Sequence, residues 1–439
     1  MVARIKGDVS EAALREAVAK ARQRHTNVRA RIVEGEDGAL WLTSDGAGAI
    51  TVEVIPRESN EHWVRVHHEI TQRPFDFDER PPVRFVLLQD AGAADLLISC
   101  HHIICDGLSL AYLARDILSY LGDPAQEVEV LPDPLPVSVE TIPSQVSLNA
   151  LVRFFINRIN RKWQADAVTF DLEDYRSIAA AYWANFQHRV IPIELTEDQT
   201  TALVERCRAE GVTVNSALAA AFAGAQVSVL GEQPYLSKIG VAASLRDRLR
   251  EPAGEAMGFF AGVASVDFRY DIGSAFWENA RRFHARARSL YTDRNLFGDF
   301  AAWSYLEPTY LEAFTFKKLG RLVPLGDARH AKLAAFSQQQ DAVLSQLKRD
   351  KMDMLDEIFM GAAITNLTRM DFPREYGALE LDRLLMQPGG AFPLANVGLV
   401  LGAVTCSGKL SMLVEYAEQA VDTPTMERIR EQALTFLWG

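Results

Sequence analysis

Cysteine, long apolar runs and surplus positive charge are all scarce in this sequence. Only four of its 439 residues are cysteines, and none has the C-x-x-C spacing of a zinc or redox site. The longest weakly polar stretches, 216–230 and 397–406, fall short of the roughly 20 residues that span a bilayer. The start has no signal-peptide core or cleavage site. The sequence therefore predicts a cytoplasmic protein without a transmembrane segment, whose cysteines are small buried side chains.

The charge and composition exclude several further classes. A formal net charge of −12 argues against nucleic acid as the partner, because phosphate binding needs a basic face. With 48% hydrophobic and 24% charged residues, the chain is not collagen, a coiled coil or a mainly disordered protein. Its length is enough for two or three domains, or for one large one.

Strand patterns alternate with helix patterns through both halves of the chain. Prolines crowd residues 131–147, which predicts a loop or linker there. We therefore expect an α/β fold in two parts, 1–175 and 176–439. Residues 397–405 and 409–416 predict a hairpin, and residues 327–360 a helix.

Residues 151–164 form a predicted basic amphipathic helix. Its cationic side chains stand against an apolar set that includes Phe154, Phe155 and Ile159. Such a helix can pack on its own protein or lie on a membrane surface. We expect this helix to pack on its own protein, because the chain as a whole is acidic.

One short motif dominates the functional interpretation. His101 and His102 are followed after three residues by Asp106 and Gly107, between a predicted strand and a predicted helix. Histidine exchanges protons near neutral pH. Neighbours on an extended segment point to opposite faces, so one imidazole can face a cavity while the other anchors the loop. Asp106 can fix the loop through an ion pair or backbone bonds, and Gly107 permits a close approach or an unusual backbone conformation.

Two other site types fit the motif poorly. Adjacent histidines cannot easily share one metal ion, and the sequence shows no third ligand, so we expect no metal. The serines nearby lack the Gly-x-Ser-x-Gly setting of a catalytic nucleophile. A second pair, His67-His68, has no Asp-Gly after it and is interpreted as surface or core filling.

The motif resembles the active-site signature of the condensation-domain and chloramphenicol-acetyltransferase-like acyltransferases. This superfamily includes nonribosomal-peptide condensation domains, polyketide-associated acyltransferases and alcohol acyltransferases. Further segments resemble the family in order and spacing: 5–9, 24–29, 73–84, 211–215, 244–260 and 365–377. Family members usually carry an additional segment before the first strand, so a shortened chain or a more open acceptor side is expected.

The resemblance implies a fold of two α/β lobes, each a mixed sheet flanked by helices, arranged as a V with a tunnel between them. It implies that His102 is the general base, that His101 holds the loop and that Asp106 is a structural anchor. The partner of Asp106 would be Arg246 or, less favoured, Arg29. Asn366 would lie near the tunnel.

The activity implied is transfer of an acyl group from a thioester to a hydroxyl, with an amine as the second choice. Acyl-coenzyme A or a phosphopantetheinyl carrier thioester would be the co-substrate, with no tightly bound cofactor, and the enzyme would be a monomer. One alternative is amide-forming condensation between carrier-bound substrates; another is a non-catalytic binding protein. The basic residues of 317–351 could face an acidic carrier protein or coenzyme A phosphates, but a solvated helix face is the favoured interpretation.

Overall fold

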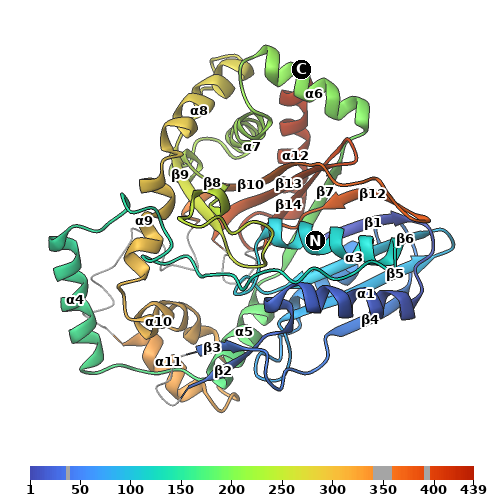
Figure 1. The fold of residues 1–439 in the computed structure, drawn as a ribbon. Helices are drawn as coiled ribbons and strands as arrows, with labels where there is room; N and C mark the ends of the chain where they lie inside the picture. Colours follow the sequence, from blue (N-terminus) through green and yellow to red (C-terminus); the bar gives the residue numbers. More distant parts are fainter. Residues whose placement is uncertain (36–39, 340–357, 390–395) are drawn as a thin grey trace.

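Two six-stranded sheets, one in each lobe, organise the fold (Figure 1). This computed structural model describes residues 1–35, 40–339, 358–389 and 396–439. The first sheet has the order β11-β12-β1-β6-β5-β4. Its strands are β1 (Val2–Lys6), β4 (Thr51–Pro56), β5 (Val83–Asp90), β6 (Ala93–Cys100), β11 (Glu375–Tyr376) and β12 (Leu379–Leu385). A separate hairpin joins β2 (Arg31–Glu34) and β3 (Leu40–Thr43).

The second sheet has the order β7-β14-β13-β10-β8-β9. Its central strand β10 runs parallel to both neighbours, β13 and β8. The predicted hairpin is confirmed as β13 and β14, which pair antiparallel. The strands are β7 (His188–Glu194), β8 (Lys238–Ser244), β9 (Ala261–Asp267), β10 (Met360–Met370), β13 (Val397–Cys406) and β14 (Lys409–Ala417).

The C-terminal part of the chain completes the first sheet. Strand β12 pairs antiparallel with β1, so that Leu385 stands opposite Val2. The N-terminal sheet therefore contains two strands that follow residue 370. The boundary between 175 and 176 stays a prediction, and helix α5 (Leu172–Asn185) runs across it.

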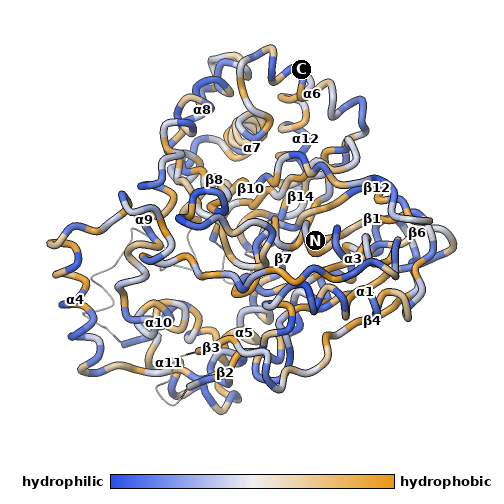
Figure 2. Tube along the Cα trace, in the orientation of Figure 1, coloured by the Kyte–Doolittle hydropathy of each residue, from blue (hydrophilic) through white to orange (hydrophobic). Residues whose placement is uncertain are grey.

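Alternating side chains give each face of the first sheet its own core. Ala3 and Ile5 pack under α1 (Glu11–Arg24) and α3 (Gly107–Gly122). Val2, on the opposite face, packs with α2 (His62–Gln72). This separation follows from the two-residue period of a strand. Hydrophobic segments accordingly lie in both sheets in Figure 2.

Four helices pack with the second sheet around one apolar core. They are α6 (Glu197–Ala209), α7 (Val214–Leu230), α8 (Phe276–Leu290) and α12 (Thr423–Trp438). Helix α7 is rich in alanine, and its small side chains allow close approach on most of its surface. Among the described helices, none alone is long and apolar enough to cross a membrane; α6 and α7 together pass by length and composition but are bent by 93°.

A third group of helices lies beside the lobes. It comprises α4 (Ala150–Gln164), α5, α9 (Asp293–Trp303), α10 (Pro308–Leu319) and α11 (His330–Gln338). Short 3-10 helices lie at Thr26–Arg29, Pro234–Ser237, Arg246–Arg248 and Gly320–Leu322. Residues 131–147 contain neither helix nor strand, which confirms the predicted loop.

Two helix predictions need correction. The helix predicted over 327–360 extends only over His330–Gln338; residues 340–357 lie outside the described part, and residue 360 begins β10. Residues from 360 onward form a strand because they pair with β13 on one side and with β8 on the other. In α4 the buried face is Ile156, Ile159 and Trp163, whereas Phe154 and Phe155 are 54% and 53% exposed. The helix meets the protein along one narrow stripe at i, i+3 and i+7.

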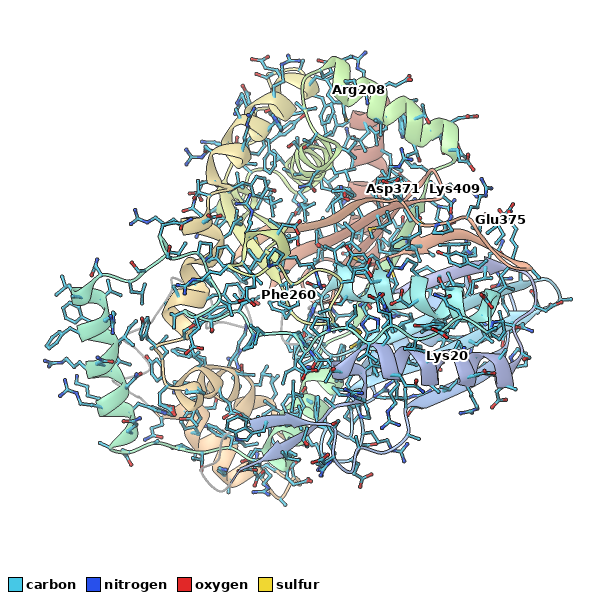
Figure 3. The ribbon with its side chains drawn as sticks, in the orientation of Figure 1. Lys20, Arg208, Phe260, Asp371, Glu375 and Lys409 are labelled. Atoms are coloured by element: carbon cyan, nitrogen blue, oxygen red, sulfur yellow. The ribbon has the colours of Figure 1, made fainter. Side chains whose placement is uncertain are left out.

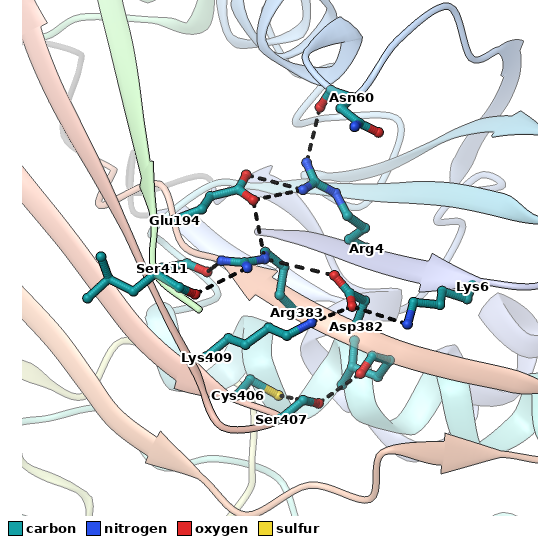
Figure 4. A network of polar contacts seen from close by, with 12 residues as sticks. Arg4, Lys6, Asn60, Glu194, Asp382, Arg383, Cys406, Ser407, Lys409 and Ser411 are labelled. Carbon is teal, nitrogen blue, oxygen red and sulfur yellow. Dashed lines mark hydrogen bonds and ion pairs between the residues drawn. The ribbon is translucent and has the colours of Figure 1, made fainter. Parts of the chain in front are cut away.

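Charged side chains connect the two sheets (Figure 4). Arg4 of β1 binds Glu194 of β7 at 2.9 Å. Arg383 of β12 also contacts Glu194, and it donates to the Ser411 hydroxyl on β14 at 3.1 Å. These contacts join the two sheets through β1 and β12 on one side and β7 and β14 on the other.

Candidate active site

The histidine motif lies in the turn between β6 and α3. Asp106 is the N-cap of α3, and its side chain accepts a hydrogen bond from the Ser109 backbone N–H at 2.7 Å. An acidic cap satisfies one of the free N–H groups of the first helical turn. The loop that holds His101 and His102 is therefore fixed at its helical end.

His102 has a defined tautomer. Its Nδ1 lies 2.9 Å from the backbone carbonyl of Cys105. A carbonyl oxygen only accepts, so Nδ1 carries the hydrogen and Nε2 of the neutral ring keeps a free lone pair. The side chain is exposed, lines a cavity and packs edge-on against Phe259 at 5.2 Å between ring centroids. Nε2 is therefore arranged as a proton acceptor.

His101 lines the same cavity but makes different contacts. Its backbone N–H donates to the Pro82 carbonyl at 3.0 Å, and its Nδ1 accepts from the Ile103 N–H at 3.2 Å. The ring stands edge-on to Phe77, with centroids 5.1 Å apart. Burial lowers the pKa of His101 to about 4, which keeps the ring neutral at neutral pH. These contacts suit an anchor of the loop.

Asp106 forms a buried ion pair with Arg246, and Arg29 contacts Thr26 instead. Oδ1 lies 2.9 Å from Arg246 Nη2, and Oδ2 accepts from the Phe260 backbone N–H at 3.1 Å. Figure 3 labels Phe260 near the centre of the molecule. Arg246 also donates from Nη1 to two backbone carbonyls, at 2.7 and 2.9 Å. The two side chains are only 5% and 3% exposed, so the pair fixes the loop against the second lobe.

A cavity of about 380 Å³ surrounds His102. Gly107 lines it, and a Cβ there would lie 2.9 Å from Leu367 and 3.0 Å from Met386, so a close approach is what this glycine permits. His67, which the sequence predicts to be surface or core filling, also lines the cavity. Burial lowers the pKa of His67 to about 4.

Gly389 was not identified from the sequence. A Cβ at this position would lie 2.6 Å from His102 Nε2, and its φ is +69°. The residue therefore leaves open the space in front of the proton-accepting atom. Its Pro-Gly context signals a turn, but no local signal reveals that the turn meets His102.

Asn366 is not among the described residues that line the His102 cavity. Its side chain accepts a hydrogen bond from the Thr368 backbone N–H at 2.7 Å, and Thr368 has a φ of +63°. Asn366 thus supports the irregularity in the pairing of β10 between Asn366 and Arg369. Its predicted place near a tunnel stays a prediction.

The basic region 317–351 is partly neutralised. Arg329 lies 3.0 Å from Asp171, and Lys332 pairs with Asp174 at the start of α5. Lys348, Arg349 and Lys351 fall outside the described residues. Within the described part of the chain, no group of three His, Cys, Asp or Glu side chains could hold a metal ion.

Comparison with known proteins matches two segments of the chain to family models. Residues 1–129 match the family described as Condensation domain, and residues 184–289 match the Phthiocerol/phthiodiolone dimycocerosyl transferase C-terminus. Phosphinothricin tripeptide synthetase PhsC of Streptomyces viridochromogenes is 26% identical over 222 residues, covering 48% of this chain. The chain spans only 19% of that synthetase.

Solved structures share the fold over the whole chain. The epimerization domain of the third module of tyrocidine synthetase B aligns with a TM-score of 0.60 at 13% identity, covering 100% of this chain and 90% of that one. Polyketide synthase associated protein 5 from Mycobacterium tuberculosis aligns with a TM-score of 0.59 at 17% identity, covering 100% and 94%. The fold is thus the two-lobed α/β fold of condensation domains. The chain belongs to the condensation-domain and chloramphenicol-acetyltransferase-like acyltransferase superfamily.

Proposed function

We propose that this protein transfers an acyl group from a thioester to a hydroxyl acceptor, with His102 as the general base. The observation that carries the proposal is the hydrogen bond from His102 Nδ1 to the Cys105 carbonyl, which in the neutral ring directs the lone pair to Nε2 beside the cavity. A base positioned in this way contributes typically about 10²–10⁴-fold to the rate. The donor would be acyl-coenzyme A or a carrier-bound thioester.

The reaction needs one proton acceptor that returns its proton. Nε2 takes the proton of the acceptor hydroxyl while its oxygen attacks the thioester carbonyl carbon. The carbon–sulfur bond then breaks, and the leaving thiolate takes the proton from Nε2. A neutral imidazole is the required starting form, and the Cys105 carbonyl holds the ring in the matching tautomer.

The test is thiol release from coenzyme A thioesters of graded chain length, with alcohols and amines as acceptors. We expect His102→Ala to lose at least about 100-fold in kcat/KM. His330→Ala is the matched control, because His330 Nδ1 also binds a backbone carbonyl, that of Val323, at 2.7 Å. Turnover by His102→Ala at the wild-type rate would refute the assignment.

Amide-forming condensation is the second candidate. The match of residues 1–129 to the condensation-domain family favours it, together with the synthetase relatives. Carrier proteins would then act in trans. Faster turnover with carrier-loaded donors and amine acceptors than with coenzyme A thioesters and alcohols would select this candidate. The monomeric state and the cytoplasmic location stay predictions.

A further inference from the structure

A second cavity, of about 600 Å³, adjoins the catalytic cavity. Four residues line both: His67, Thr71, Trp183 and Gln387. Because these side chains form a common wall, a ligand group in the second cavity lies close to a ligand in the first. Sequence reasoning did not identify the second cavity.

Four of the described residues that line this second cavity have a buried polar atom without a hydrogen-bond partner: His188, Glu415, Glu427 and Arg430. Glu427 Oε2 and Arg430 Nη1 form an ion pair at 2.8 Å, whereas Glu415 and His188 are held less closely. Glu415 of β14 is 1% exposed and His188 of β7 is 8% exposed, and both line the cavity. Glu415 Oε1 and His188 Nδ1 lie 3.6 Å apart, too far for a hydrogen bond, and neither bonds to another described residue. Buried polar groups are nearly always paired, so such a couple beside a cavity indicates a missing polar partner.

The remaining atoms of the pair are held firmly. Gln387 Nε2 donates to Glu415 Oε2 at 3.0 Å. His188 Nε2 lies 2.7 Å from the Tyr182 hydroxyl. When that hydroxyl donates, the imidazole hydrogen sits on Nδ1, so the pair offers one acceptor and one donor side by side.

We propose that Glu415 and His188 bind a second, non-reacting hydroxyl group of a substrate. A hydroxyl donates and accepts, so it can donate to the Glu415 carboxylate while it accepts from His188 Nδ1. An ammonium group only donates and would leave the imidazole N–H unpaired. The inference rests on the proposed acyl transfer, because it assigns the second hydroxyl to a substrate of that reaction.

The substrate has to extend from one site to the other. Gln387 binds Glu415, and Gly389 stands against His102 Nε2. The Cα atoms of Gln387 and Gly389 lie at most about 7 Å apart, and the Gln387 side chain with its 3.0 Å hydrogen bond adds to this distance. The substrate is therefore a bifunctional molecule that reaches past Gln387 from the first cavity into the second. The hydroxyl could belong to the acceptor, as in a linear diol, or to the end of the acyl chain of the donor.

The experiment has two arms with the wild-type protein. In the first, linear diols are compared with primary alcohols of equal length, using one unsubstituted acyl-coenzyme A donor. In the second, ω-hydroxyacyl and unsubstituted acyl donors are compared, using one primary alcohol. We expect at least about a tenfold preference in kcat/KM for the hydroxylated substrate in one of the two arms. The arm that shows the preference tells whether the bound hydroxyl belongs to the acceptor or to the donor. A diol has two reacting groups, so a twofold excess is statistical.

Glu415→Gln tests the site itself. We expect it to reduce the preference to the statistical value, whereas Glu205→Gln on the exposed face of α6 keeps it, because Glu205 lines neither cavity. Tyr182→Phe supplies a second variant if Glu415→Gln does not fold, and we expect it to weaken the preference by releasing His188. A folded Glu415→Gln with the wild-type preference overturns the proposal.

The two proposals fail in different ways. The proposed function fails if no donor and acceptor pair releases thiol, or if His102→Ala retains turnover. The second-hydroxyl site fails if turnover is present without a preference beyond twofold in either arm. Ligand-induced shifts in melting temperature give a readout without turnover: equal shifts by hydroxylated and unsubstituted compounds overturn the site even when catalysis is absent.

Discussion

The ion pair between Asp106 and Arg246 gives the sharpest stability prediction. In Asp106→Ala, Arg246 stays buried without its carboxylate, although its bonds to the carbonyls of Gly254 and Ala256 remain. The Phe260 N–H and the Ser109 N–H also lose their acceptor. The substitution therefore removes a helix cap and a contact between lobes at once.

The magnitude follows from these two losses. Removing one partner of a buried ion pair costs about 3–5 kcal/mol. Losing an Asp N-cap costs about 0.5–2 kcal/mol. The terms overlap because one carboxylate supplies both, so we expect the free energy of unfolding to fall by about 4 kcal/mol. His102→Ala should lose less than about 1 kcal/mol, because it removes one hydrogen bond of an exposed side chain.

Urea titration followed by tryptophan fluorescence measures these losses. Asp106→Asn is the matched variant, since it keeps an oxygen for the cap without the charge, and we expect an intermediate loss. In the double variant Asp106→Leu with Arg246→Leu, no charge is left buried, so the loss should be smaller than the sum of the single losses. If Asp106→Ala changes the free energy of unfolding by less than about 1 kcal/mol, the structural role assigned here is wrong.

Three further predictions concern the surrounding residues. Gly389→Ala should lower kcat/KM at least about tenfold, because its Cβ would meet His102 Nε2 at 2.6 Å; unchanged kinetics would contradict this. Folding lowers the pKa of His101 from 6.5 to about 4. Its contribution to stability is therefore unchanged above pH 6.5 and falls as the unfolded chain binds a proton below it, by about 3 kcal/mol at pH 4. Urea titrations at pH 7 and 4 should show a smaller fall in His101→Gln than in wild type. Glu255→Gln should lose about 1 kcal/mol, because Glu255 binds Arg115 at 2.6 Å from a partly exposed position; an unchanged urea midpoint would exclude this role.

Local signals predicted much of the secondary structure. The alternation of strands and helices, the Pro-rich loop and the hairpin of β13 and β14 are present where the sequence places them. The capping box at Thr196 and Gln199 opens α6 with both of its hydrogen bonds. These features depend on residues a few positions apart, and their physical causes act within that distance.

Prediction from local patterns failed where contacts with segments distant in the sequence decide the structure. Residue 360 was assigned to a helix but begins β10, because strands on both sides pair with it. Phe154 and Phe155 were assigned to a packed face but are exposed, because α4 meets the protein along only one stripe. Helix periodicity gives the apolar set, but the neighbouring elements decide which part of it is covered.

The sequence by itself contained the motif, and the resemblance that it carries predicted the base and the superfamily, because a short loop between a strand and a helix holds these residues. Only the tertiary structure decided the partner of Asp106, since Arg246 lies 140 residues away along the chain. It also placed Gly389 against His102 and brought Glu415 beside His188. Such contacts depend on how the two lobes and strand β12 pack together. Residues so far apart along the chain share no repeating pattern from which their contact could be predicted.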